Sequence, residues 1–154
     1  MRHSKKIMFA VLGCSLVASA CGPTFKMTMP DGFVKYEEGS DFKMITADGV
    51  RLKARQVENY PRADMAFWKD ALARHMTERG YAKKSEHCFK TQKGLDGCTL
   101  DFLLPYGADD WILQETIFIE GDQIVLVEVA GPFQRFQAYG KSLQEALVSF
   151  HTGS

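Results

Sequence analysis

The sequence predicts an α+β domain with an antiparallel sheet of about six strands, covered by one long helix and one C-terminal helix. Three observations support this prediction. Strand-like segments occur in pairs around glycine-containing turns, a central segment has helical periodicity, and a second amphipathic segment closes the chain. Because tight hairpins join antiparallel strands, three such pairs make one antiparallel sheet.

The first hairpin is predicted from residues 41–47 and 50–58, which flank Asp48-Gly49, a dipeptide typical of a two-residue turn. Its second strand alternates between apolar Val50, Leu52 and Ala54 and basic Arg51, Lys53 and Arg55. We expect the apolar set to face the core and the basic set to form a ridge on the other side.

The long helix is predicted over residues 64–79. Its apolar face is formed by side chains spaced three or four apart, namely Met65, Trp68, Leu72, His75 and Met76. Gly80 is well placed to end the helix in the left-handed conformation. Trp68 is expected to dock this helix on the sheet.

The remaining elements are predicted further along the chain. A second hairpin joins 86–91 to 98–104, and a third joins 111–120 to 123–130. The spacing Ser142-x-x-Glu145 predicts a capping box at the start of a closing helix.

The chain begins with a leader that resembles an export signal. Residues 1–6 carry three basic side chains and no acid, and an apolar run of eleven residues follows at 7–17. That run is too short to cross a hydrocarbon core, which needs about 20 apolar residues. It is typical of the central region of a signal peptide, and Ala18-Ser19-Ala20 supplies the small residues of a cleavage site.

Ser19-Ala20-Cys21 also resembles the lipobox of bacterial lipoproteins, with Ala18 where leucine is usual. The resemblance implies a lipoprotein signal peptide over 1–20, a lipid on the Cys21 thiol, a short tether over 21–26 and a single domain over 27–154. Gly22 follows the cysteine, and the absence of Asp there implies delivery to the outer membrane, facing the periplasm. An ordinary cleaved signal peptide is the alternative.

The charge balance outside the leader and the motifs that are missing there restrict the classes of function that the sequence supports. The leader holds three of the 19 basic residues and none of the 19 acidic ones, so residues 21–154 carry a net charge of −3. This balance argues against general nucleic-acid binding. No zinc-ligand spacing, phosphate-binding loop or nucleophile elbow occurs, so the sequence predicts no catalytic residue, no metal site and no cofactor.

Cys88 and Cys98 lie on the two arms of the second hairpin, where a disulfide is expected in an oxidising compartment. Strand alternation places Cys98 on the apolar side and Cys88 on the polar side. Directly paired cysteines should share a face. A bulge or an irregular turn around Gly94 and Gly97 would reconcile the two, and two free thiols are the alternative.

The body resembles the PsbP-like superfold and, within it, the DcrB-like envelope lipoproteins. The matching features are "MPDGF" near its start, the helix that carries Trp68, and the run from "TIFIEGDQIVLVEVAG" to "LQEALVSF". The resemblance implies a small, non-catalytic domain that binds or scaffolds another envelope component.

Candidate contact residues are aromatic and basic side chains, namely Trp68, Tyr106, Trp111, Arg51, Lys53 and Arg55. For the three aromatic side chains core packing is the favoured interpretation, and contact with a partner or a ligand is the alternative. The basic ridge is predicted to be a solvated strand face that discourages edge-to-edge pairing, with contact to anionic headgroups as the alternative. Two functions follow. One is a lipid-anchored, non-enzymatic envelope protein with a protein partner. The other is a small-ligand-binding lipoprotein with an apolar pocket between sheet and helix, lined by Trp68, Trp111 and Phe118.

Overall fold

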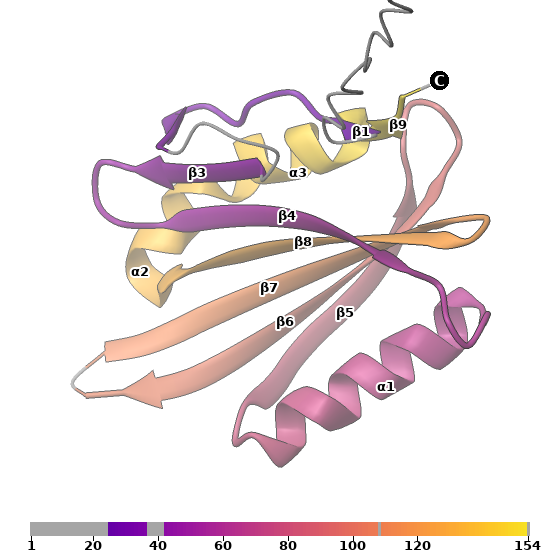
Figure 1. Cartoon of the computed structure of the whole chain (residues 1–154). Coiled ribbons are helices and arrows are strands. Elements are labelled where there is room, and N and C mark those ends of the chain that lie inside the picture. Colours follow the sequence, from indigo (N-terminus) through magenta and orange to yellow (C-terminus); the bar gives the residue numbers. More distant parts are fainter. Residues whose placement is uncertain (1–24, 37–41, 108, 154) are drawn as a thin grey trace, which may run out of the picture.

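A computed structural model describes residues 25–36, 42–107 and 109–153, and it shows one curved antiparallel sheet with helices on both faces (Figure 1). The strands of this sheet, in spatial order, are β2 (Phe33–Lys35), β3 (Phe42–Thr46), β4 (Arg51–Glu58), β8 (Gln123–Pro132), β7 (Asp109–Glu120), β6 (Asp96–Tyr106) and β5 (Ala82–Lys90). A second, two-stranded sheet pairs β1 (Phe25–Lys26) with β9 (His151–Thr152).

The predicted α+β class is confirmed, and so are the three hairpins, which are β3–β4, β5–β6 and β7–β8. The main sheet has seven strands because β2 also pairs with β3. β2 has three residues and β1 and β9 have two each, so they are too short to show a periodic pattern. The leader, Cys21 and the tether up to residue 24 lie outside the described residues. Phe25 is already buried in the domain.

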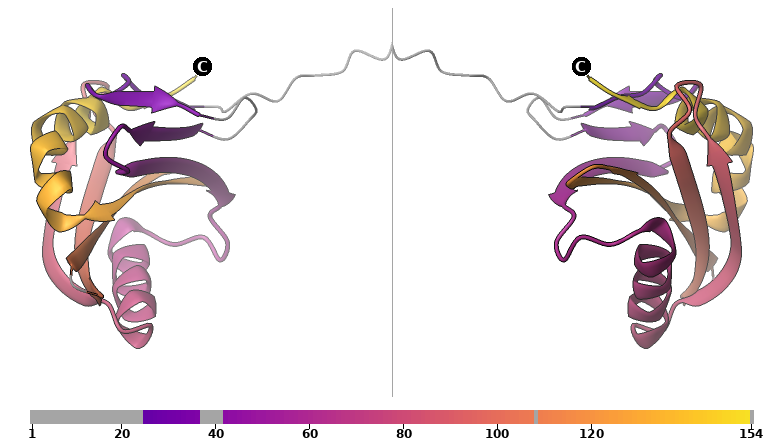
Figure 2. Two further views of the ribbon diagram at one scale, coloured as in Figure 1. Left: turned by 90° about the vertical axis from the view of Figure 1, so that its left-hand side faces the viewer. Right: turned by 90° about the vertical axis from the view of Figure 1, so that its right-hand side faces the viewer.

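The helices lie on opposite faces of the sheet (Figure 2). One face carries α2 (Phe133–Phe136), a 3₁₀ turn η1 (Gln137–Tyr139) and α3 (Gly140–Ser149), and the other carries α1 (Met65–Glu78). The α3 face holds the larger core, in which the rings of Phe118 and Phe150 stack with their centroids 3.9 Å apart. The α1 face holds a smaller cluster built on Leu100, Phe102 and Ile117.

α1 begins and ends close to where the sequence predicts. The Asp64 carboxylate caps it by accepting a hydrogen bond from the Phe67 backbone N–H at 2.9 Å. Gly80 follows the helix with a φ of +90°, the left-handed conformation that glycine adopts without strain. The sequence therefore specifies both ends of this helix locally.

The predicted capping box at Ser142 is wrong. α3 begins at Gly140, and the residue before it, Tyr139, already has a helical backbone because η1 runs straight into α3. A capping box needs an extended residue before the first turn, and here there is none. The Ser142 hydroxyl instead donates a hydrogen bond to the Tyr139 carbonyl at 3.1 Å.

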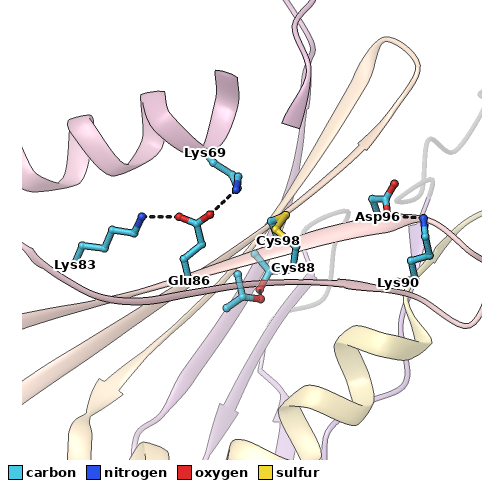
Figure 3. Close-up of a disulfide and its surroundings, with 9 residues drawn as sticks. Lys69, Lys83, Glu86, Cys88, Lys90, Asp96 and Cys98 are labelled. Atoms are coloured by element: carbon cyan, nitrogen blue, oxygen red, sulfur yellow. Dashed lines mark hydrogen bonds and ion pairs between the residues drawn. A yellow bond between two sulfur atoms is a disulfide. The ribbon is translucent and has the colours of Figure 1, made fainter. Parts of the chain in front are cut away.

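The Cys88–Cys98 disulfide is confirmed (Figure 3), and the two residues are direct cross-strand partners with Cα atoms 4.1 Å apart. The expectation that they point to opposite faces is wrong. Glu86 and Cys88 lie on the same face as α1, where Glu86 pairs with Lys69 of that helix. This part of β5 looks polar because β5 is an edge strand. No bulge separates the cysteines, since the register shift lies at Lys83/Ser85.

Candidate functional site

A groove runs beside α1, between this helix and strands β4, β7 and β8. It has two lobes. The polar lobe measures about 630 Å³ and the apolar lobe about 390 Å³. Leu72 and His75 line both lobes, so the two lobes adjoin each other along α1. We call these two lobes together the α1 groove. Ligand sites in proteins are typically apolar clefts of this size with a few converging polar groups.

The apolar lobe is bounded by Trp68, Ala71 and Leu72 of α1 and by aliphatic side chains of the sheet, namely Val57, Ile117, Ile124 and Leu126. Phe67 is half exposed beside it, and its ring meets the Trp68 ring edge-on with centroids 5.2 Å apart. This lobe therefore offers an apolar surface that the chain's own side chains leave open.

Asn59 fixes the orientation of Trp68. The Trp68 indole N–H donates to the Asn59 Oδ1 atom at 2.7 Å. The Asn59 amide in turn donates to the carbonyls of Ala63 at 3.1 Å and Gly121 at 3.3 Å. Because Asn59 is only 4% exposed and fully hydrogen-bonded, it ties the start of α1 to the turn between β7 and β8.

The polar lobe holds two glutamates that are direct cross-strand partners, Glu115 on β7 and Glu128 on β8. Glu115 is 4% exposed, and its Oε2 atom has no hydrogen-bond partner among the described residues. Burial raises the pKa of Glu115 to about 8, the charge of Glu128 adds to the increase, and Arg55 opposes it. Glu115 is therefore mostly protonated at neutral pH.

Two arginines line the polar lobe from different elements, Arg55 on β4 and Arg79 at the C-terminal end of α1. Within the described residues, neither of them forms an ion pair with a carboxylate. Arg51 and Lys53 extend the positive charge along β4. Their cross-strand partners Ala130 and Glu128 line the lobe, so both residues share its face of the sheet.

The structure brings several of the predicted contact residues to this groove. Trp68 lines the apolar lobe, and Trp111 and Arg55 line the polar lobe. Tyr106 is a strand residue of β6, and its side chain lies outside the described part of the chain. Trp68 also packs against the α1-face core, as predicted.

Two expectations about these residues are wrong. Phe118 does not line the α1 groove, because it points to the other face of the sheet, where it packs against Phe89 and Phe150 and borders a separate pocket of about 460 Å³. The basic ridge does not protect a sheet edge either. β4 is an interior strand between β3 and β8, so its backbone is already paired on both sides.

Sequence reasoning did not single out the two glutamates. Glu115 interrupts a run of alternate positions that are otherwise apolar, Trp111, Leu113, Ile117 and Ile119. An acid in such a run is a signal of a buried polar group, because those positions share one face of the strand. His75 is exposed and lines the groove, although the sequence favoured a packed core histidine.

Among residues 25–36, 42–107 and 109–153, no three histidine, cysteine or acidic side chains lie close enough together to hold a metal ion. The helices described here are all too short or too polar to cross a membrane.

Comparison with known proteins identifies solved structures that have a similar fold. No family model and no curated protein matches the chain. LpqN of Mycobacterium tuberculosis, described as involved in cell envelope biogenesis, superposes with a TM-score of 0.70 at 8% identity, over 89% of this chain and 88% of LpqN. Cyanobacterial PsbP (CyanoP) of Synechocystis sp. PCC 6803 superposes with a TM-score of 0.63 at 13% identity, over 92% of this chain and 98% of CyanoP.

The chain has the PsbP-like fold. The Ran-binding protein Mog1p of Saccharomyces cerevisiae has the same fold, with a TM-score of 0.60 and 13% identity over 84% of this chain and 90% of Mog1p. At such identities the likeness concerns the backbone alone. The function of this chain has to be argued from its own groove.

Proposed function

We propose that this protein is a non-enzymatic component of the bacterial cell envelope, held at a membrane by acyl chains on Cys21, and that its α1 groove binds an amphipathic envelope component. The leader supports this location in the cell envelope, since an apolar run and small residues precede Cys21. LpqN, which has the same fold and is involved in cell envelope biogenesis, is consistent with this location. The absence of Asp after Cys21 supports attachment to the outer membrane on its periplasmic side.

The observation that carries the binding function is the open groove itself. An interior-type core would fill the space between helix and sheet at the density of an organic crystal. Here the space beside Trp68 and Leu72 stays open, while Glu115 and Arg55 converge on its other end. Apolar walls with a few polar groups at one end suit a molecule that has a hydrocarbon part and a polar head.

The groove is tested with an uncharged fluorescent probe, N-phenyl-1-naphthylamine, and two matched variants. Ala71→Trp places a large ring in the apolar lobe, which Ala71 lines, whereas Ala66→Trp places the same ring on an exposed position of the same helix. We expect the probe to bind wild type and Ala66→Trp alike and to lose most of its binding to Ala71→Trp. Equal binding by both variants contradicts the proposed site.

The anchor is tested by metabolic labelling with a radioactive fatty acid. We expect label and membrane association in the wild type and neither in Cys21→Ala, because the thiol is the proposed acylation site. A labelled, membrane-bound Cys21→Ala protein contradicts the anchor. Separation of inner and outer membranes then reports which membrane holds the wild type.

A second candidate function is a protein partner that docks over the same face. It is favoured by the exposed apolar side chains Val57 at the end of β4, Tyr60 in the connection that follows and Phe67 in the first part of α1. A photo-crosslinking amino acid at position 67 is expected to give a discrete protein adduct in intact cells, and one at the exposed position 141 of α3, on the opposite face of the sheet, is not. Absence of an adduct at position 67 argues against this candidate.

A further inference from the structure

We infer that the ligand of the α1 groove is a single-chain anionic lipid, a long-chain fatty acid, whose carboxylate lies between Arg55 and Arg79 and whose hydrocarbon chain occupies the apolar lobe. This inference rests on the proposed function, because it names the chemical class that the same groove takes. Three properties of the groove support it. They are its two-part shape, the charges at its polar end, and the hydrogen-bonding capacity left unused there.

The shape of the groove matches a molecule with one head and one tail. The two lobes adjoin at Leu72 and His75, and their character changes from aliphatic to charged across those residues. The apolar lobe has no charged lining group except Glu58 at its margin, next to the exposed Val57, and the histidine that borders the polar lobe. A single hydrocarbon chain fits this arrangement, because its burial is favourable along the aliphatic walls and its head then reaches the polar lobe.

The charges of the polar lobe favour an anionic head. Arg55 and Arg79 approach from opposite walls, one on the sheet and one at the end of α1, and neither forms an ion pair among the described residues. A guanidinium group matches a carboxylate with two parallel hydrogen bonds. The basic neighbours Arg51 and Lys53 add to this field, in a chain whose residues 21–154 carry a net charge of −3.

Glu115 supplies a hydrogen-bond donor to such a head. Its Oε2 atom is buried in the lining of the lobe without a partner, and its pKa of about 8 keeps a proton on the carboxyl at neutral pH. A protonated carboxyl donates a strong hydrogen bond to a carboxylate. A hydrogen bond between Glu115 and Glu128 is one cause of the raised pKa, so the ligand head replaces Glu128 as the acceptor of this proton. The other titratable or charged groups that line the lobe are Glu128 on β8, Arg55 on β4, and His75, Arg79 and Tyr81 from α1 and the residues after it.

The pH dependence of binding follows from this arrangement. Above pH 8 Glu115 loses its proton, so the donor disappears and a second negative charge joins Glu128 beside the head. We therefore expect fatty-acid affinity to stay high near pH 7 and to fall as the pH rises through 8 to 9. An uncharged ligand of the same chain length lacks the repulsion and should lose less affinity over that range.

The test uses the complete chain with Cys21→Ala, which removes the proposed acyl anchor and leaves every described residue unchanged. Binding of palmitate, uncharged 1-monopalmitoylglycerol and cationic hexadecyltrimethylammonium is measured by calorimetry below their micelle concentrations. We expect palmitate to bind about 10-fold more tightly than the uncharged probe, since a charge-assisted hydrogen bond is lost with the carboxylate. Shortening the fatty acid by one buried methylene should weaken binding about fourfold.

Arginine variants test the position of the head. We expect Arg55→Gln and Arg79→Gln each to weaken palmitate binding about 10-fold and to leave the uncharged probe unaffected. Arg74→Gln on the same helix as Arg79 is a matched control outside the lining and should bind palmitate normally. Circular dichroism of each variant confirms folding, and Arg79→Gln serves as the test if Arg55→Gln does not fold.

The outcomes separate this inference from the proposed function. Equal affinity for palmitate and 1-monopalmitoylglycerol, or tighter binding of the cationic probe, overturns the anionic ligand while the groove remains the binding site. So does equal loss of palmitate binding in Arg74→Gln and Arg79→Gln. Failure of all three probes to bind, or binding that Ala71→Trp leaves intact, overturns the proposed groove function as well.

Discussion

The two faces of the sheet differ in how completely they are packed. On the α3 face, aromatic rings from β7 and from the residue after α3 stack directly, and aliphatic side chains of four strands surround them. On the α1 face, the helix contacts a smaller cluster and leaves a groove that contains a buried carboxyl. The α3 face therefore holds most of the buried apolar side chains, and the α1 face keeps a buried carboxyl that folding alone does not require.

The largest effect is expected from a cavity on the α3 face. Phe118→Ala removes a fully buried ring that stacks on Phe150 and should lower the free energy of unfolding by about 4 kcal/mol. Leu72→Ala in the wall of the α1 groove should cost only about 1–2 kcal/mol, because that side chain is half-buried beside open space. Urea denaturation compares the two. Similar losses would remove the difference between the faces.

The next effect has the opposite sign. In the folded protein Glu115 keeps its proton up to a pKa of about 8, whereas an unperturbed glutamate ionises near 4.5. Between pH 4.5 and pH 8, folding therefore requires Glu115 to take up a proton. The contribution of Glu115 to the free energy of unfolding is full below pH 4.5 and is lost as the pH rises to 8. Glu115→Gln cannot ionise, so it should stabilise the protein by about 3 kcal/mol at pH 8 and very little at pH 4.5.

Urea denaturation at several pH values measures this difference. Glu120→Gln is a matched control, because Glu120 lies on the same strand and is exposed to solvent. A pH dependence of stability that is unchanged in Glu115→Gln would mean that Glu115 is ionised in the folded state, and the inferred donor to a fatty-acid carboxylate would then be absent.

The disulfide should contribute slightly less. It closes a loop across the β5–β6 hairpin with a sequence separation of 10, on the face where helical packing is thinner. The double variant Cys88→Ser/Cys98→Ser should lose roughly 2.5–3 kcal/mol of unfolding free energy on the chain-entropy model. Reduction of the wild type with dithiothreitol should give the same loss. An unchanged urea midpoint in both experiments would show that packing alone holds β5 in place.

The smallest effect concerns the start of α1. Asp64→Ala removes the side chain that accepts the Phe67 N–H hydrogen bond and should lower stability by about 1 kcal/mol. Amide hydrogen exchange should increase in the first turn of α1 and remain slow in α3, which has no side-chain cap of this kind. Faster exchange in α3 as well would indicate that the two faces unfold together.

Much of the fold could be predicted because local signals agree with the tertiary structure. Asp48-Gly49 defines the β3–β4 turn, where Gly49 has a φ of +90°, and Asp64 and Gly80 define α1. The disulfide could be expected from cysteine count and position. Its geometry could not, because the alternation of β5 was interpreted without knowing that Lys69 of α1 faces Glu86.

The elements that the sequence did not reveal depend on distant contacts. β2 and β1 form because they pair with β3 and with the C-terminal β9, and segments of two or three residues have no periodicity of their own. The start of α3 is likewise set by η1 and the docking of Phe136, which override the capping pattern at Ser142.

The candidate site was predicted in part for the same reason. Trp68 and Trp111 stand out as large aromatic side chains, and both line the groove. Glu115 and Glu128 belong to the predicted third hairpin, but the importance of Glu115 also depends on its burial beneath α1 and on the nearness of Arg55 from β4. A single sequence does not show that β4 and α1 are brought to this hairpin.

The pairing of β1 with β9 joins the first described strand of the domain to the last one. Figures 1 and 2 show this small sheet at one pole of the molecule and α1 at the other. If the N-terminal side is the one fastened to a bilayer, α1 and the groove beside it lie at the end of the domain farther from that bilayer. Removal of His151 and Thr152 would leave β1 without its partner strand and would expose Phe25, which is buried in the intact domain.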